Sequence, residues 1–206
     1  MKRVLKVLLM TAALTVITGV AAQSALADTS VMYSTQGCFG AACVPINIAT
    51  LNTTNNAATL RYTGQGASSI VIPTNSFTSA QLGMFDWALS GTGTFAPTAF
   101  TLRIVQTLPA GQGTLSATVQ GTVQSNGSQT EIVFSTTSVQ IAGITYTLSN
   151  LGGPGTTTST SLLINAPGQQ TSVQSIATAV PEPGSMFLLG TGLIGAATAL
   201  RRRFRR

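Results

Sequence analysis

Residues 114–124 read TLSATVQGTVQ, and polar side chains alternate strictly with apolar or small ones along the segment. The apolar or small positions are Leu115, Ala117, Val119, Gly121 and Val123. Successive side chains of a β-strand point to opposite faces, so this period of two predicts a strand with one buried and one exposed face. The segment therefore predicts that the part of the chain around it is all-β.

The same alternation extends outward from this segment. Residues 100–105, FTLRIV, repeat it, and the turn sequence SNGS at 125–128 leads into an apolar return at 131–135, which predicts a hairpin. Further strands are expected at residues 59–62, 69–72, 85–89, 139–141 and 144–148. About eight short antiparallel strands favour a β-sandwich, with a β-barrel as the alternative. Residues 77–89 could instead hold one or two helical turns.

The N-terminal 27 residues have the three parts of a secretory signal peptide. The basic residues at its start are Lys2, Arg3 and Lys6. An apolar stretch covers residues 7–20, and Ala25-Leu26-Ala27 forms an A-x-A cleavage site that predicts cleavage before Asp28. An uncleaved N-terminal anchor is the alternative. We therefore expect the Sec machinery and signal peptidase as the first partners.

The C-terminal residues 180–206 read VPEPGSMFLLGTGLIGAATALRRRFRR. The seventeen residues 184–200 are uncharged, and as a helix they would span about 26 Å, close to the ~30 Å hydrocarbon core of a bilayer. The basic residues behind this segment are Arg201, Arg202, Arg203, Arg205 and Arg206. Arginines stop transfer and stay in the cytoplasm, so we expect a single transmembrane helix at 185–200 with the preceding chain outside.

Two prolines flank Glu182 immediately before this predicted span. Pro181 and Pro183 each fix φ and lack a backbone donor, so the stretch is expected to be extended and unpaired, as a processing enzyme requires. The motif Val180-Pro181-Glu182-Pro183-Gly184, the span and the arginines together resemble the PEP-CTERM family of exported bacterial proteins. The resemblance covers the C-terminal 27 residues only.

This resemblance implies a route and a processing enzyme. It implies a substrate of exosortase, a membrane-embedded, cysteine transpeptidase-like enzyme that acts at or near the Pro-Glu-Pro. It also implies a Gram-negative-type envelope, a transient inner-membrane anchor with the body in the periplasm, and a final place at the cell surface or in a matrix that contains exopolysaccharide. A permanently anchored single-pass domain is the alternative.

The terminal segments carry most of the charge of the chain. The full sequence has ten basic and four acidic residues, a net charge of +6. Between residues 28 and 179 only two arginines oppose three acids, a net charge of −1. A nucleic-acid partner is therefore not expected, because the body has no basic patch to hold phosphates.

The sequence divides into four parts. Residues 1–27 are the signal peptide, 28–150 a β-rich exported domain, 151–179 a Gly/Thr/Ser-rich linker, stalk or last strand, and 180–206 the sorting signal. Cys38 and Cys43 are the only cysteines, and in an exported protein they are expected to form a local disulfide, which would stabilise the fold by about 2 kcal/mol. Redox or metal chemistry is the alternative for this pair.

The inventory of side chains excludes most enzyme mechanisms. The chain has no histidine, and residues 28–179 have no lysine, so triads, Cys-His pairs and Schiff bases are not available. Asp86 and Glu131 could act as a glycosidase carboxylate pair beside Trp87. We instead expect Asp86 to be a turn or capping acid, Glu131 a solvated strand residue and Trp87 a core residue. No metal or cofactor is expected.

The sequence therefore predicts a non-enzymatic surface or matrix protein that exosortase processes. A carbohydrate-binding module delivered by the same route, or at the extreme a glycosidase, is the alternative. Exopolysaccharide is a possible partner in either case.

Overall fold

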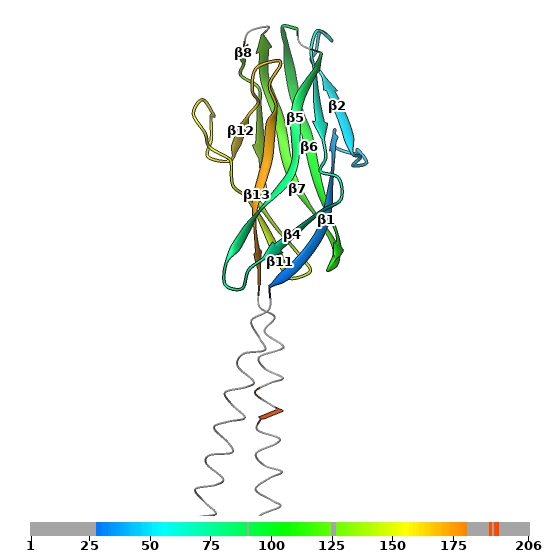
Figure 1. Ribbon diagram of the computed structural model, residues 1–206. Helices are drawn as coiled ribbons and strands as arrows, with labels where there is room; N and C mark the ends of the chain where they lie inside the picture. Colours follow the sequence, from blue (N-terminus) through cyan, green and yellow to red (C-terminus); the bar gives the residue numbers. More distant parts are fainter. Residues whose placement is uncertain (1–27, 90, 125–126, 181–189, 191, 194–206) are drawn as a thin grey trace, which may run out of the picture.

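The computed structural model describes residues 28–89, 91–124, 127–180, 190 and 192–193. The described body is all-β and consists of two curled antiparallel sheets (Figure 1). The first sheet has the order β12 (Ser161–Leu163), β9 (Glu131–Phe134), β7 (Ala110–Gln124), β6 (Gly93–Leu108), β1 (Thr29–Phe39) and β4 (Ser68–Ile72), with β8 (Gly127–Ser128) paired to β7. The second has the order β10 (Ser138–Ile141), β11 (Ile144–Leu148), β13 (Thr171–Ala179), β5 (Phe77–Leu89), β3 (Thr59–Thr63) and β2 (Ile48–Asn52).

The segment at residues 114–124 forms the greater part of β7, and its alternation is confirmed. Leu115, Val119 and Val123 are fully buried and Ala117 nearly so, whereas Thr114 and Ser116 are exposed. β7 pairs with β6 on one side and with β9 on the other, so the predicted hairpin is also present. The buried faces of both sheets contribute to one common core, an arrangement consistent with a β-sandwich.

Three aromatic rings join the two sheets at the centre of this core. Tyr62 and Phe85 come from the second sheet and Phe100 from the first, and the three ring centroids lie 5.1–5.2 Å apart. All three side chains are fully buried. Gly37 leaves room for this cluster, because a Cβ built on it would lie 2.5 Å from the Tyr62 ring and 2.9 Å from the Phe100 ring. Burial and ring contact together make the cluster a major source of stability.

The helical alternative for residues 77–89 is wrong. These residues form β5, a thirteen-residue strand between β3 and β13. The period of two is interrupted where Gly83 (φ +124°) lies opposite a register shift of β13. Leu82 and Phe85 are both buried on either side of this bulge, and their spacing of three resembles that of a helix.

Residues 151–179 contribute strands to both sheets. Leu162 of β12 and Ile164 behind it are buried, although the sequence predicts only a loop or linker there. β13 is hydrogen-bonded between β11 and β5, so of the two alternatives for its residues the strand is right and the stalk is wrong. The described body has thirteen strands, more than the eight expected, and β5, β6 and β7 are each at least thirteen residues long.

The three tyrosines of the body predict how its stability depends on pH. Burial raises the pKa of Tyr33 and Tyr62 above the ordinary value of 10.0, and raises the pKa of Tyr146 to about 12. A phenol is charged only when deprotonated, so the folded state holds these protons more tightly than the unfolded state. This contribution to stability is complete below pH 10 and is lost as the pH rises towards 12 and beyond.

We therefore expect the urea midpoint to stay flat from about pH 6 to about pH 9 and to fall above pH 10, since no lysine or histidine titrates in residues 28–180. Each buried tyrosine contributes about 1.4 kcal/mol per pH unit to the fall. Urea titrations of the body and of Tyr146→Phe at several pH values measure this, and the variant should lose less stability in alkali. A fall that begins near neutral pH would contradict the expectation.

Candidate functional site

The sorting signal begins where the second sheet ends. β13 ends at Ala179, and the backbone N–H of Val180 donates to the carbonyl oxygen of Gly143 at 2.8 Å. Pro181, Glu182, Pro183 and Gly184 of the predicted motif lie outside the described residues, as do the five arginines. The last described strand thus holds the chain in place up to the first residue of the motif.

The first described residues, at the start of β1, lie at the same end of the body as the end of β13 (Figure 1). The carboxylate of Asp28 accepts a hydrogen bond from the backbone of Thr74 at 3.2 Å. Thr74 belongs to the turn between β4 and β5, and Phe77, which begins β5, lies opposite Thr178 of β13. Both predicted processing points, at Asp28 and after Val180, therefore border one turn. Ala25 and Ala27 lie outside the described residues.

No helix within the described ranges is long and apolar enough to cross a membrane. The span expected at residues 185–200 lies outside the described residues, except for Gly190, Gly192 and Leu193.

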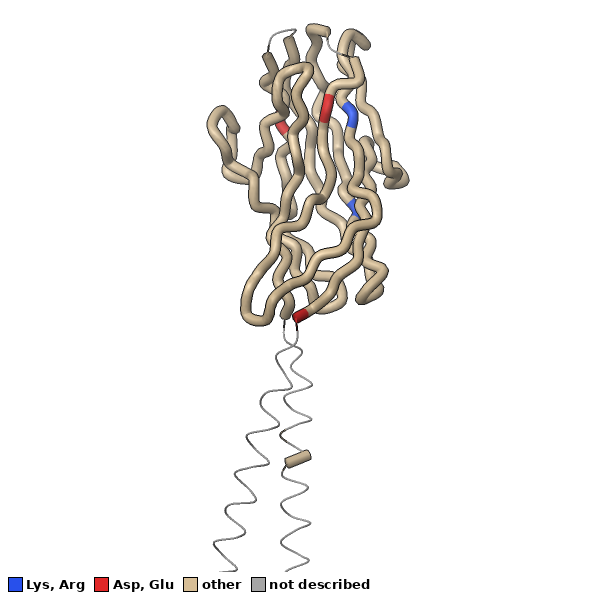
Figure 2. The backbone as a smooth tube through the Cα atoms, viewed as in Figure 1, with Lys and Arg blue, Asp and Glu red and all other residues tan. Residues whose placement is uncertain are grey.

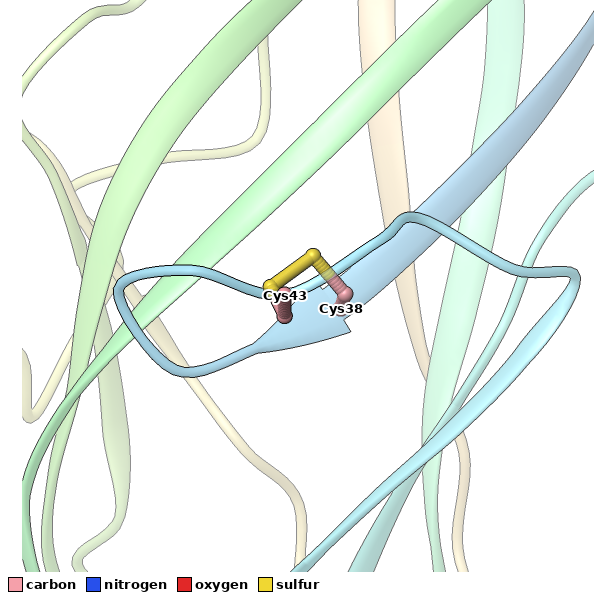
Figure 3. The surroundings of a disulfide bond; sticks show 2 residues. All are labelled: Cys38 and Cys43. Carbon is pink, nitrogen blue, oxygen red and sulfur yellow. A yellow bond between two sulfur atoms is a disulfide. The ribbon is translucent and has the colours of Figure 1, made fainter.

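Cys38 and Cys43 form a disulfide, as expected from their spacing (Figure 3). The Cα atoms lie 5.8 Å apart, and the bond closes the turn that follows β1. Cys38 is buried beside the core, and Gly37 makes a bridge to Ile46 on the far side of the turn. The disulfide fixes a surface turn, and the described residues contain no other cysteine.

Asp86 lies within a strand and pairs with Arg61, so its predicted place in a turn or cap is wrong. Arg61 donates from Nε to Oδ1 at 2.8 Å and from Nη2 to Oδ2 at 2.5 Å. The two residues face each other across β3 and β5. The hydrogen bond and charge of Asp86 raise the pKa of Arg61. Asp86 is thus engaged as a structural ion-pair partner.

Glu131 is buried, contrary to the solvated position expected for it. Only 4% of it is exposed, and it lies on β9 of the first sheet, whereas Asp86 lies on β5 of the second. Its Oε1 accepts from the backbone N–H of Thr157 at 2.8 Å and its Oε2 from the Thr157 hydroxyl at 2.6 Å. The loop that carries Thr157 lies 26 residues further along the chain, so sequence alternation could not show that it covers this carboxylate.

Removing the Glu131 carboxylate is expected to destabilise the body. Glu131→Ala removes two hydrogen bonds between the buried carboxylate and Thr157, which is exposed, and hydrogen bonds to a charged group should cost about 1.5–3 kcal/mol to remove. Thr157→Ala removes only the hydroxyl contact and should cost about 1 kcal/mol. Urea denaturation of both variants measures the difference. Equal stability of Glu131→Ala and the parent chain would show that the buried contacts contribute nothing.

Trp87 packs at the margin of the core and is not free to bind a ligand through both ring faces. Its ring centroid lies 6.0 Å from that of Phe95, and it is partly buried against the core. Its Nε1–H donates to the carbonyl oxygen of Asn165 at 2.9 Å. The indole therefore holds the loop that carries Asn165 in place through this hydrogen bond.

That loop borders a surface pocket of about 330 Å³. Its amide side chains are Asn150, Asn165 and Gln170, and Pro154 and Leu163 supply apolar surface. Asn150 is held at both ends of its amide, because its Nδ2 donates to Ser172 O and its Oδ1 accepts from Gln174 N. Gln170 is exposed and lies on the rim. The pocket leaves no signal in the sequence, because its lining comes from residues 150–156 and 162–172, which meet only in the folded chain.

A metal site does not emerge from the described part of the chain, where no group of three or more acidic or cysteine ligands comes together. Asp86 and Glu131 each have their own partner and lie on different sheets. The structure therefore offers two candidate features. One is the pair of predicted processing points at one end of the body, and the other is the polar pocket beside Asn165.

A family model for the PEP-CTERM protein-sorting motif matches residues 179–203. No curated protein and no solved structure matches the chain. The matched residues begin at the last residue of β13 and extend into the arginine run, so the motif directly follows the folded body. The chain is thus a β-rich protein that carries a C-terminal PEP-CTERM protein-sorting motif, which implies processing by exosortase.

Proposed function

We propose that this is a non-enzymatic surface or extracellular-matrix protein, released from a transient membrane anchor by exosortase and retained among exopolysaccharide. The observation that carries the proposal is the sorting motif at residues 179–203, which starts where the last strand ends. In this function the tail directs the protein to its place, and the β-body is the part that remains there.

The chemistry of the body supports a structural role. Its acids on the strands, Asp86 and Glu131, are bound to Arg61 and Thr157, and neither carboxylate is left for proton transfer. The whole chain lacks histidine, and residues 28–180 lack lysine. The outer faces of the strands present mainly threonine, serine and glutamine, which hydrogen-bond to hydrated polysaccharide without attracting counter-ions.

The test is the intact mass of the protein from a native-type host, with and without its exosortase. Loss of the first 27 residues in both hosts, and loss of the chain beyond the Pro-Glu-Pro only with exosortase present, is the expected result. Cell fractionation should place the processed form at the surface or in the matrix. A full-length C-terminus in both hosts would identify a permanently anchored domain and would overturn the proposal.

A carbohydrate-binding function is the second candidate, and the pocket between the two loops favours it. Amide and hydroxyl side chains line it beside apolar Pro154 and Leu163, a combination suited to the polar edges and apolar faces of sugars. Trp87 is a poor test of this function because it supports the core. Gln170→Ala removes a rim side chain without touching the hydrogen bonds of Asn165.

Binding to isolated exopolysaccharide and to a glycan array tests this candidate. Gln170→Ala should weaken binding, while Gln140→Ala, an exposed glutamine on edge strand β10, should not. Absence of binding by the parent chain, or equal binding by all three, would remove the pocket from consideration and leave the structural role.

A further inference from the structure

Five large apolar side chains are exposed at the end of the body where the chain enters and leaves. They are Met32 (45% exposed), Val71 (52%), Phe77 (60%), Leu108 (52%) and Val180 (42%). We call them the tail-proximal set. The described residues contain nine such exposed large hydrophobic side chains, so more than half of them gather at this one end.

Strand pairing places these side chains next to one another. Met32 lies opposite Leu108 across β1 and β6, and Val71, opposite Ser30, is its diagonal neighbour on β4. These three therefore form a row across the outer face of the first sheet. On the second sheet, Phe77 lies opposite Thr178, two residues before Val180. Both sheets thus present apolar side chains around the start of the tail.

Charged side chains are almost absent from this end. In Figure 2 the lower end of the body is tan, apart from an acidic position where the described chain begins, which is Asp28. Arg61 and Asp86 lie towards the opposite end, since they pair on the β3–β5 ladder near Leu89. The residues that flank the tail-proximal set, such as Ser30, Ser69 and Thr107, are small and uncharged. Apart from Asp28, this surface can approach lipid without desolvating a charged side chain.

The tail brings this end to the membrane surface. Only residues 181–183 separate Val180 from the uncharged segment that begins at Gly184. Even a fully extended chain covers about 14 Å in these four steps. The polar layer on each side of the hydrocarbon core is about 5–8 Å thick. While the tail is anchored, the tail-proximal set therefore lies within reach of the lipid headgroups.

We propose that the tail-proximal set docks the body on the outer surface of the inner membrane before processing. The set inserts its side chains among the headgroups and holds the body upright, so that the Pro-Glu-Pro stays at the membrane surface where the processing enzyme acts. This inference rests on the proposed function, because it needs the tail in the membrane. Val180 links the docked end directly to the motif.

Quenching by lipid tests the docking. The chain is purified with its tail from a host that lacks exosortase and is reconstituted into vesicles of phosphatidylethanolamine and phosphatidylglycerol that contain a headgroup-labelled quencher. A fluorophore is attached at F77C, at L108C or at the control L89C. Phe77 and Leu89 are similarly exposed and lie at opposite ends of β5, about 40 Å apart.

The expected result is loss of most of the fluorescence at positions 77 and 108, and little loss at position 89. Equal quenching at all three positions, or none at 77 and 108, overturns the docking. Labels at position 77 of two different chains could lie close together and not be quenched by lipid. A second copy of the chain would then cover the tail-proximal set, and the proposal would fail. Flotation with the vesicles is measured on the same samples, and a chain that does not float shows that the anchor itself is missing.

A second measurement covers the case in which a label disturbs folding. Phe77→Asp should slow release by exosortase in the host, and Leu89→Asp should leave the rate unchanged. Circular dichroism of both chains shows whether the sheets are intact. If folded Phe77→Asp is released at the same rate as the parent chain, the tail-proximal set has no role in processing, and this outcome counts against the docking.

Discussion

Replacing Pro181, Glu182 and Pro183 by three alanines is expected to abolish release of the protein from the membrane. Alanine permits helix, so the predicted span at 185–200 could extend back towards Val180 and remove the extended, unpaired stretch that the prolines enforce. Glu182 also supplies the only charge between the body and the arginines. Intact mass and fractionation in a host with exosortase should show loss of nearly all the processed form.

The matched control removes two prolines from the body. Pro154→Ala with Pro167→Ala changes two loop positions of the described body and leaves the motif intact, so release should be normal. The alanine variant of the motif should also fold normally, because β13 ends before it. A processed mass from that variant equal to that of the parent chain would show that the enzyme does not need the Pro-Glu-Pro.

Phe100→Ala is expected to destabilise the body by about 3–5 kcal/mol, the usual cost of removing a buried phenylalanine ring. Phe100 is fully buried and its ring contacts those of Phe39, Tyr62 and Phe85 at centroid distances of 5.1–5.2 Å. It is the residue of the first sheet that meets both rings of the second. Its loss leaves a cavity between the sheets, which the long paired strands cannot close.

Urea denaturation measures this effect, with Phe77→Ala as the control. Phe77 is 60% exposed at the start of β5, so its truncation should change stability by less than about 0.5 kcal/mol. A domain of this size has a total stability of about 5–15 kcal/mol, so Phe100→Ala should lower the midpoint substantially. Similar midpoints for the two variants would mean that the ring cluster does not hold the sheets together.

Local alternation predicted the strands well wherever the period of two is unbroken. The strands around Leu115 and Phe100, and the pairing of β7 with β9, are of this kind. Gly121 shows the limit of the method. It occupies an apolar position of the pattern, but its φ is +112°, and a Cβ built on it would lie 2.1 Å from the carbonyl oxygen of Gln129. Glycine is therefore needed here to let the segment around Gln129 approach β7, and not to fill the core.

The errors arise where distant segments decide the environment. The bulge at Gly83 depends on the register of β13, and the burial of Glu131 depends on the loop of Thr157. The pocket beside Asn165 likewise forms from two loops that meet only in the folded chain. The sorting motif could be predicted because its chemistry lies in consecutive residues, and it is also the part that the comparison with known families identifies.

The position of the two chain ends at one end of the body leaves the other end independent of export. The turn between β2 and β3, the start of β6 and the end of β7 lie at that opposite end, where Thr54 N donates to Thr94 O and Gly93 lies opposite Val123 (Figure 1). Insertions in the turn between β2 and β3 would alter neither predicted processing point. This end can therefore diversify freely, and a peptide grafted there would be displayed as far from the membrane as the fold allows.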